Sequence, residues 1–349
     1  MKVVHIESGL GNQMLDYAEY LAIKMCNPNE PCYIENIIYE IKECNSTISM
    51  WNGYELERIF GIREPNIKEY FTDKQWERIL NDVSKSEFWL DNWRYPTAIN
   101  DAFAKEGLML KNINYRPTSK EKKNSLGSLK KMRTAFVSTY FGYTFKRILF
   151  RFLAKKVSNG DGNTERLFYS TDENIYGGHF LKFCKKGNGI ERIELQLRKA
   201  FIFPELTDEK NLRGLNMIKN FNSVSIHVRR GDMLSMNGYC YKFGYFKRAV
   251  KFIKKRVNNP VFFFFCDAGS SDWCKENYRI FNIDPSKDSV YFVDWNKEAD
   301  SYKDMQLMSQ CKHNIITNSS FGWWASYLNE NPNKITCSPD IRMNTTHSF

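Results

Sequence analysis

The sequence predicts a protein of the α/β class with two domains built on parallel sheets. Two features predict this class: the chain opens as strand, glycine turn and helix, and after residue 220 short apolar segments alternate with helical patterns. Such alternation indicates parallel sheets that are covered on both faces. A chain of 349 residues is too long for one ordinary domain and sufficient for two.

The first elements are a strand at residues 3–6, a turn at 8–11, and a helix in which apolar side chains recur at helical spacing over 12–25. Asn-Pro and Glu-Pro pairs within residues 27–31 end this helix. A second strand is expected at residues 33–39.

The turn Gly9-Leu10-Gly11-Asn12-Gln13 begins like a dinucleotide-binding fingerprint, but Met14 stands where the third glycine belongs. The sequence therefore disfavours an enzyme that transfers hydride with a dinucleotide. The two glycines instead allow the backbone to approach a ligand closely, so this loop is a candidate binding loop.

Beyond residue 220 the pattern is regular. We expect, in order, strand 224–228, helix 246–257, strand 261–266, helix 273–278, strand 290–293, helix 301–311, strand 315–317 and helix 322–328. We place the boundary near residues 204–220, which gives an N-terminal domain of residues 1–210 and a C-terminal domain of residues 211–349.

Residues 118–160 form an insertion of different composition in the N-terminal domain. Over residues 129–157, large apolar side chains alternate with the bases Lys130, Lys131, Arg133, Lys146, Arg147, Arg151, Lys155 and Lys156. A basic amphipathic segment can lie on an anionic membrane. A surface helix that packs on the protein is the other interpretation, and the sequence leaves both open.

The formal net charge of +11 implies anionic partners: nucleotide phosphates, acidic lipid head groups or nucleic acid. Nine cysteines occur without a C-x-x-C pair, so we expect reduced thiols in a cytosol and neither a disulfide framework nor a zinc ribbon. We also expect no signal peptide and no transmembrane helix, because Lys2 leads directly into a strand and no apolar run of about 18 residues occurs.

Polar side chains follow three of the predicted strands. The segment His227 to Asp232 ends the first strand of the second half, Asp267 ends the phenylalanine-rich strand, and Asn318 follows the last strand. Ligands of open parallel sheets bind beyond the carboxyl ends of the strands. This common placement predicts a ligand site there.

Arg229 and Arg230 indicate which ligand. A guanidinium binds phosphate through two parallel hydrogen bonds and keeps its charge at neutral pH. A diphosphate leaving group needs that neutralisation as its glycosidic bond breaks. An ordinary surface salt bridge is the alternative, but the pair directly follows a buried strand.

The other polar residues are weaker signals. Ser319 and Ser320 lie where a helix begins, which is a natural phosphate site, and simple N-capping is an equal alternative. Asp267 and Asp304 can accept hydrogen bonds from ribose or base, although an aspartate after a strand is more often a cap or turn residue.

Two absences narrow the chemistry. The sequence has no G-x-x-x-x-G-K-[ST] loop, so a P-loop kinase or NTPase is not expected. It also has no D-x-D motif, with which metal-dependent sugar transferases commonly hold their diphosphate. We therefore expect cationic side chains in place of a metal, and no metal or cofactor requirement.

In four motifs the chain resembles the α-1,2-fucosyltransferases of glycosyltransferase family 11. The motifs are residues 9–14 with Tyr17-Ala18, the H-x-R-R-x-D segment at 227–232, the strand end at 263–267, and residues 304–309 through Asn318-Ser319-Ser320-Phe321-Gly322-Trp323-Trp324. The likeness covers about the first 25 residues and nearly all of residues 220–335, whereas residues 40–200 match poorly.

The resemblance implies a GT-B fold, in which two Rossmann-like domains face each other across a cleft, with the acceptor on the N-terminal side and the GDP-sugar on the C-terminal side. It implies that L-fucose is transferred from GDP-L-fucose to the 2-hydroxyl of a galactose, with inversion and without a metal. By the same likeness Arg229 and Arg230 hold the β-phosphate, and His227 with Asp304 faces the guanine. The residue after Asp267 departs from the family's pattern, because the family usually has a second aspartate where Ala268 stands.

The motifs do not identify the catalytic base. An inverting transfer needs a group that takes the acceptor's proton, or a loose transition state in which the leaving phosphate does so. The candidates are Asp232, beside the arginines, and Glu7 or His5, at the edge of the first domain. Asp232 is also a candidate for merely orienting the arginine loop.

We therefore expect a cytoplasmic galactoside α-1,2-fucosyltransferase that acts on a galactose-terminated glycan, a lipid-linked precursor of a surface polysaccharide. The basic insertion is expected to hold it at the inner face of the membrane. A transferase with another donor or acceptor sugar is the first alternative. A non-enzymatic binder of polyanions or nucleic acid is the second, but no nucleic-acid motif is present and no nucleic-acid partner is expected.

Overall fold

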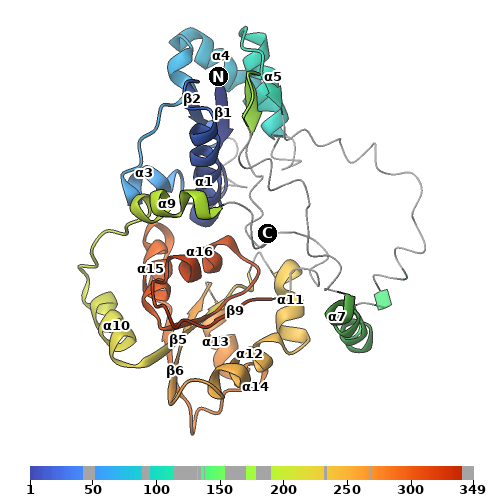
Figure 1. Ribbon diagram of the computed structural model, residues 1–349, viewed down its shortest axis with the longest axis vertical. Coiled ribbons are helices and arrows are strands. Elements are labelled where there is room, and N and C mark those ends of the chain that lie inside the picture. The colour runs from blue at the N-terminus through green and yellow to red at the C-terminus, as the bar shows by residue number, and fades with distance from the viewer. Residues whose placement is uncertain are drawn as a thin grey trace. The chain divides into compact units, whose positions relative to one another are not determined.

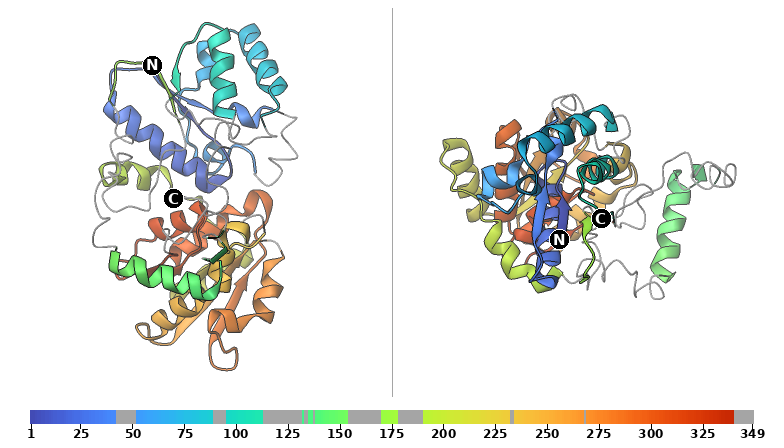
Figure 2. Two further views of the ribbon diagram at one scale, coloured as in Figure 1. Left: turned by 90° about the vertical axis from the view of Figure 1, so that its right-hand side faces the viewer. Right: turned by 90° about the horizontal axis from the view of Figure 1, so that it is seen from above.

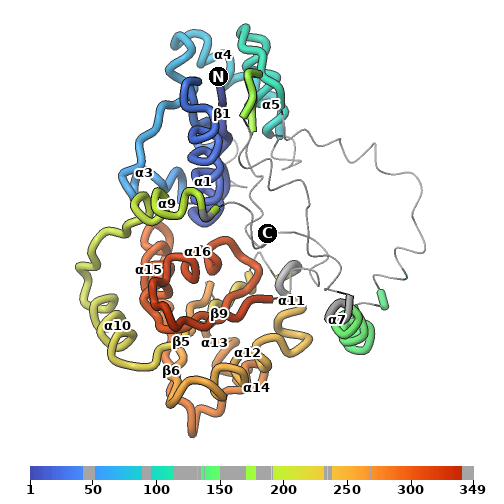
Figure 3. Tube along the Cα trace, in the orientation of Figure 1, coloured from blue at the N-terminus to red at the C-terminus, as the bar shows by residue number. Residues whose placement is uncertain are grey.

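The computed structural model describes most of the chain, drawn as ribbons in Figure 1 and as a trace in Figure 3. The described residues are 1–41, 52–88, 95–112, 132, 135–136, 138–153, 170–177, 190–231, 234–267 and 269–339. The chain divides into two compact units: unit 1 comprises Met1–Gly127 with Asn159–Ile202, and unit 2 comprises Ser128–Ser158 with Phe203–Phe349.

Unit 1 is built on a parallel sheet with the strand order β2-β1-β4-β3. Its strands are β1 (Lys2–His5), β2 (Cys32–Glu35), β3 (Lys111–Asn112) and β4 (Ile175–Gly177). Its helices are α1 (Leu10–Cys26), η1 (Ile37–Tyr39), α3 (Glu55–Phe60), η3 (Ile67–Tyr70), α4 (Asp73–Lys85), α5 (Tyr95–Lys105), η5 (Ile190–Ile193) and α9 (Glu194–Ala200). The predicted opening of strand, turn and helix is confirmed, and the second strand ends earlier than predicted because residues 37–39 form a 3-10 turn.

Unit 2 is built on a second parallel sheet with the order β7-β6-β5-β8-β9. Its strands are β5 (Asn222–Val228), β6 (Pro260–Cys266), β7 (Ser289–Val293), β8 (His313–Ile315) and β9 (Thr336–Cys337). Its helices are α7 (Tyr140–Leu153), α10 (Glu209–Asn220), α11 (Leu234–Lys242), α12 (Tyr245–Lys254), α13 (Ser270–Glu276), α14 (Tyr278–Phe281), η6 (Glu298–Asp300), α15 (Tyr302–Gln310) and α16 (Ser320–Leu328). The α/β class is thus confirmed, while the GT-B arrangement of the two domains stays a prediction.

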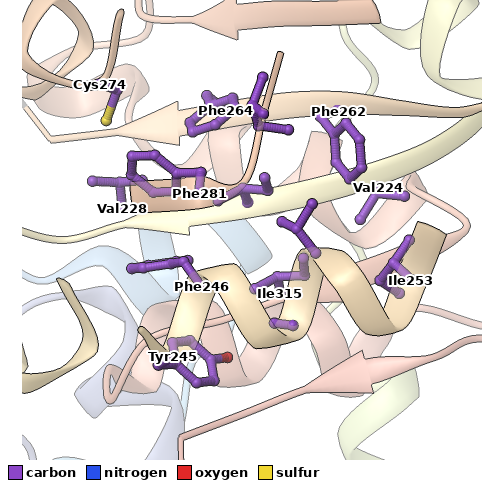
Figure 4. Packing of buried hydrophobic residues seen from close by; sticks show 14 of the residues in the cluster. Val224, Val228, Tyr245, Phe246, Ile253, Phe262, Phe264, Cys274, Phe281 and Ile315 are labelled. Atoms are coloured by element: carbon purple, nitrogen blue, oxygen red, sulfur yellow. The ribbon is translucent and has the colours of Figure 1, made fainter. Parts of the chain in front are cut away.

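The phenylalanines of β6 explain why unit 2 has a sheet covered on both faces. Side chains of a strand alternate between faces, and residues 262–265 are all buried phenylalanines. Phe262 and Phe264 pack with Phe246 and Phe281 in one apolar cluster (Figure 4). On the opposite face, Phe263 stacks on Tyr291 with ring centroids 5.4 Å apart.

The division into units differs from the predicted domains in two respects. The boundary falls between Ile202 and Phe203, ahead of the predicted boundary between residues 210 and 211. The segment that leads from Phe203 to α10 already belongs to unit 2, where the Pro204 carbonyl accepts a hydrogen bond from Gln306 of α15. The core of the insertion, residues 128–158, belongs to unit 2 and not to the N-terminal domain. Its helix α7, green in Figure 2, attaches there because Tyr143 stacks on Phe243 at a centroid distance of 4.3 Å.

Among the described residues, no helix is both long enough and apolar enough to cross a membrane.

Replacement of Phe264 by alanine should lower the free energy of unfolding by about 3–5 kcal/mol, because it leaves a cavity between Phe281 and Phe292 in the core of unit 2. Chemical denaturation followed by tryptophan fluorescence measures this loss. Phe252→Ala is the matched control, since that ring is 42% exposed, and it should cost much less. Equal losses in the two variants would contradict this account of the core.

Candidate functional site

The sheet of unit 2 has a switch point at the carboxyl ends of its strands. From the central strand β5 the chain proceeds to β6 and β7 on one side, and then to β8 and β9 on the other. Ligands of open parallel sheets bind outside such a point. The segments after β5, β6 and β8 lie together there, as predicted, because Val228 pairs with Cys266 and Ile226 pairs with Ile315.

The loop after β5 carries the two arginines, and side chains of unit 2 fix its backbone. The Arg229 N–H donates to the Tyr241 hydroxyl at 3.1 Å. The N–H groups of Arg230 and Gly231 both donate to Asp267 Oδ2, at 2.9 and 2.5 Å. A Cβ at position 231 would lie 2.9 Å from that oxygen, so the approach favours glycine. Three consecutive N–H groups are thus bound within the protein.

Asp267 positions this loop. Its second oxygen, Oδ1, accepts the Ser270 hydroxyl at 2.5 Å. We predicted from its place at a strand end that Asp267 contacts ribose or base. The structure shows its carboxylate bound by two backbone N–H groups and one hydroxyl, and a contact with ribose or base stays a prediction.

The Arg230 side chain is held against an aromatic ring. Its guanidinium carbon lies 3.5 Å from the centroid of the Trp273 ring and 5.8 Å from that of Tyr241. Its Nε is buried and has no hydrogen-bond partner among the described residues. Within the described part of the chain, no carboxylate forms an ion pair with Arg230. Stacking therefore orients the guanidinium without neutralising its charge.

His227, two residues before the arginines, is buried between β5 and α16. Its Nδ1 lies 3.2 Å from Thr317 Oγ1, and its ring stacks on Phe321 at 5.8 Å. A Cβ on Gly322 would lie 2.5 Å from Nδ1, so only glycine lets α16 approach this closely. Burial and the charge of Arg229 lower the pKa of His227 to about 3, so the imidazole is neutral at physiological pH.

The predicted phosphate site after β8 lies beside this histidine. Ser319 is the N-cap residue of α16 and makes no capping bond with its side chain. Ser320 begins the helix, and the Asn318 side chain is buried just before it. The first backbone N–H groups of a helix have no partner within the helix, which makes its N-terminus attractive to anions.

Asp304 lies in the first turn of α15 and is buried. Its Oδ1 accepts from Asn296 Nδ2 at 2.7 Å, and the same amide group contacts Asn211 Oδ1 at 3.0 Å. Burial raises the pKa of Asp304 to about 8; the Asn296 hydrogen bond opposes this rise and the charge of Asp294 adds to it. Within the described residues no cation pairs with Asp304, and no hydrogen bond joins it to His227.

The predicted N-terminal binding loop belongs to unit 1. Gly9 precedes α1, and Gly11 and Asn12 lie in its first turn. Gln13 is buried and holds the loop together: its Nε2 donates to the carbonyls of Ser8 and Gly53 at 2.9 Å, and its Oε1 accepts the Glu55 N–H at 2.8 Å. Gln13 therefore has a structural role, and ligand binding by this loop stays a prediction.

Two of the three candidate bases form a buried charged group in unit 1. His5 Nδ1 bonds Glu35, and His5 Nε2 lies 3.4 Å from Glu7 Oε2. Burial alone would lower the pKa of His5, but Glu35 and Glu7 outweigh it and raise that pKa to about 10. His5 is therefore protonated at neutral pH and unsuited to accept a proton. Asp232, the third candidate, lies outside the described residues.

No group of three or more His, Cys, Asp or Glu side chains that could hold a metal occurs among the described residues. The seven cysteines in this part of the chain are free thiols.

Tyr241, Trp273, Thr317 and Gly322 were not predicted as site residues. Tyr241 and Trp273 lie on helices whose contact with the arginine loop depends on how those helices pack on the sheet. Gly322 belongs to the motif at residues 318–324, but the sequence does not show that it makes room for the His227 ring, which lies on a distant segment of the chain.

Comparison with known proteins supports the motifs of the second half. Residues 196–340, less than half of the chain, match the model of Glycosyl transferase family 11. An alpha-1,2-colitosyltransferase of Escherichia coli is 38% identical over 131 residues, which are 36% of this chain and 42% of that protein. A galactoside alpha-(1,2)-fucosyltransferase 1 of Aotus azarae is 38% identical over 110 residues, 30% of this chain and 28% of its own length.

The chain thus spans less than half the length of these relatives. A crystal structure of NodZ alpha-1,6-fucosyltransferase co-crystallized with GDP aligns over 93% of this chain and 91% of that one, with 11% identity and a TM-score of 0.39. A score this low establishes no shared function. The sequence match is stronger, and it lies in residues 196–340, which are similar to glycosyltransferase family 11.

Proposed function

We propose that the chain is a glycosyltransferase whose unit 2 binds a nucleoside diphosphate sugar. The observation that carries this proposal is the state of Arg230: its guanidinium is stacked on Trp273 at a sheet switch point and has no carboxylate partner among the described residues. A cation that is held in place without a counter-ion is available to an anionic ligand. A diphosphate fits a pair of adjacent guanidinium groups.

The proposed chemistry is electrostatic. When the bond between the sugar C1 and the β-phosphate oxygen breaks, negative charge develops on the phosphate. Arg229 and Arg230 stabilise that charge, and the N-terminus of α16 adds to the field. Because the backbone of the arginine loop is already bound by Tyr241 and Asp267, little reorganisation is needed as the charge forms.

For the nucleoside we propose guanosine, with its base held by Asp304 and His227. Guanine presents two N–H donors on one edge, and an ionised carboxylate accepts both. Asp304 suits this role because it is buried without a cation partner among the described residues, so the two guanine N–H groups would stabilise its ionised form. The neutral His227 supplies a further hydrogen-bonding group beside the phosphate site.

The proposed reaction transfers L-fucose from GDP-L-fucose to the 2-hydroxyl of a galactose with inversion, without a metal. The relatives' names, which specify α-1,2 transfer of fucose and of colitose, support the linkage and keep the donor sugar open. Fucose and colitose differ in a single hydroxyl at C3. Another donor of this type is therefore the alternative within the same class.

The proposed base is Asp232 or Glu7. Of the two, Glu7 lies in the described part of the chain, buried beside the protonated His5. We further propose that the acceptor is a lipid-linked glycan, used by a cytoplasmic protein at the inner face of the membrane.

Replacement of Arg230 by alanine should lower kcat/KM for GDP-fucose by roughly 10²–10³, because the developing phosphate charge loses a fixed cation. Arg230→Lys should recover only part of the loss, since an ammonium cannot reproduce the guanidinium fork. Turnover with a panel of galactosides, read by mass spectrometry, measures both.

The matched control for this series is Arg256→Ala. Arg256 also stacks on an aromatic ring, that of Phe252 at 3.5 Å, but it precedes β6 and so belongs to the opposite edge of the sheet. Its variant should behave like wild type. If Arg230→Ala retained activity within about twofold of Arg256→Ala, the phosphate role of Arg230 would be refuted.

The raised pKa of Asp304 affects folding as well as binding. The stability that Asp304 contributes to the fold is present below its unfolded pKa and is lost as pH rises through about 8.

GDP affinity should increase with pH through about 8, the pKa of Asp304, and level off above it, because only the ionised carboxylate accepts the guanine N–H groups. Asp304→Asn should remove the pH dependence of GDP binding and weaken it. Calorimetric titration at several pH values tests this, and a wild-type affinity that does not change with pH would contradict it.

A further inference from the structure

Helix α7 exposes an unusual number of large apolar side chains. The exposed fractions are 69% for Tyr140, 73% for Phe141, 54% for Phe145, 49% for Ile148 and 43% for Leu149. Contiguous apolar surface of this kind on a protein marks an interaction site. All five residues fall within three turns of one helix.

The helix is attached to unit 2 by its other side. Tyr143 is buried and stacks on Phe243 at 4.3 Å, and Tyr239 packs at the edge of this small cluster. At 3.6 residues per turn, Phe141 and Phe145 lie opposite Tyr143, and Ile148 and Leu149 continue the same side. The apolar face is therefore directed away from the unit that anchors the helix.

The charge of the helix suits an anionic partner. Its sequence, YFGYTFKRILFRFL, contains Lys146, Arg147 and Arg151 and no acidic residue. Lys146 and Arg147 are half-buried and lie on either side of Tyr143, so they border the apolar face from the anchored side of the helix. Long basic side chains at such flanks can extend to lipid head groups while the apolar face enters the acyl region.

We infer that α7 is a membrane-docking helix, whose apolar face enters the surface of an anionic bilayer and whose flanking bases contact the head groups. A second copy of this chain would bring two basic helices together, which like-charge repulsion disfavours. A nucleic acid would satisfy the bases but would leave the aliphatic Ile148 and Leu149 in water. Only the purpose of this docking rests on the proposed function: docking would bring unit 2 to a lipid-linked acceptor.

The test is co-sedimentation with two kinds of vesicle, one of phosphatidylcholine alone and one of phosphatidylcholine mixed with phosphatidylglycerol. The wild-type chain should bind the anionic vesicles at low salt at least roughly tenfold more strongly than the neutral ones, and high salt should reduce this preference. The double variant Phe145→Ser with Leu149→Ser should lose binding.

The matched control is Leu212→Ser with Phe252→Ser, which removes two apolar side chains of similar exposure, 45% and 42%, from α10 and α12. This control should bind vesicles like wild type. The α7 variant should keep wild-type turnover on a soluble galactoside and a wild-type thermal shift with GDP, so a defect in vesicle binding is distinct from a failure of the proposed enzyme function.

The inference would be overturned by equal binding of neutral and anionic vesicles, by unchanged vesicle binding of the α7 variant, or by a change in the oligomeric state of that variant on size-exclusion chromatography. The last result would show that the face is an interface between two copies. Stronger binding to a random oligonucleotide than to anionic vesicles would likewise assign the surface to nucleic acid.

Discussion

The candidate site depends on one carboxylate, that of Asp267. It accepts the N–H groups of Arg230 and Gly231 and so joins the ends of two neighbouring strands. This contact exists because β5 and β6 run in parallel register with Val228 beside Cys266. The register is held by the phenylalanines of β6, which are buried on both faces of the sheet. A hydrophobic core thereby fixes the backbone from which both arginine side chains extend.

The two proposals assign the positive charge of the chain to two different tasks. Arg229 and Arg230 neutralise one compact anion at a fixed point, where stacking on Trp273 orients the guanidinium. The bases of α7 instead act on an extended surface of head groups, where their exact geometry matters little. The net charge of +11 indicated anionic partners without separating these two kinds.

The sequence pattern predicted those features of the fold and of the candidate site that depend only on residues close together in the chain. The strand ends, the arginine pair and the onset of α16 were predicted from apolar runs and from the polar residues that follow them. The role of Asp267 and the contact of Trp273 with Arg230 were not, because they depend on how distant segments pack. For the same reason the sequence analysis assigned the insertion to the wrong domain: its helix α7 joins unit 2 through the stack of Tyr143 on the distant Phe243.

The most direct test of the arginine pair as a diphosphate site is a calorimetric comparison of GDP with GMP in the presence of a chelator. The account predicts that GDP binds roughly 10- to 100-fold more tightly than GMP, because charge-assisted hydrogen bonds to the β-phosphate are lost with GMP. This preference should largely disappear in Arg230→Ala. Equal binding of the two nucleotides, or a preference for GDP that develops only when a divalent ion is added, would contradict it.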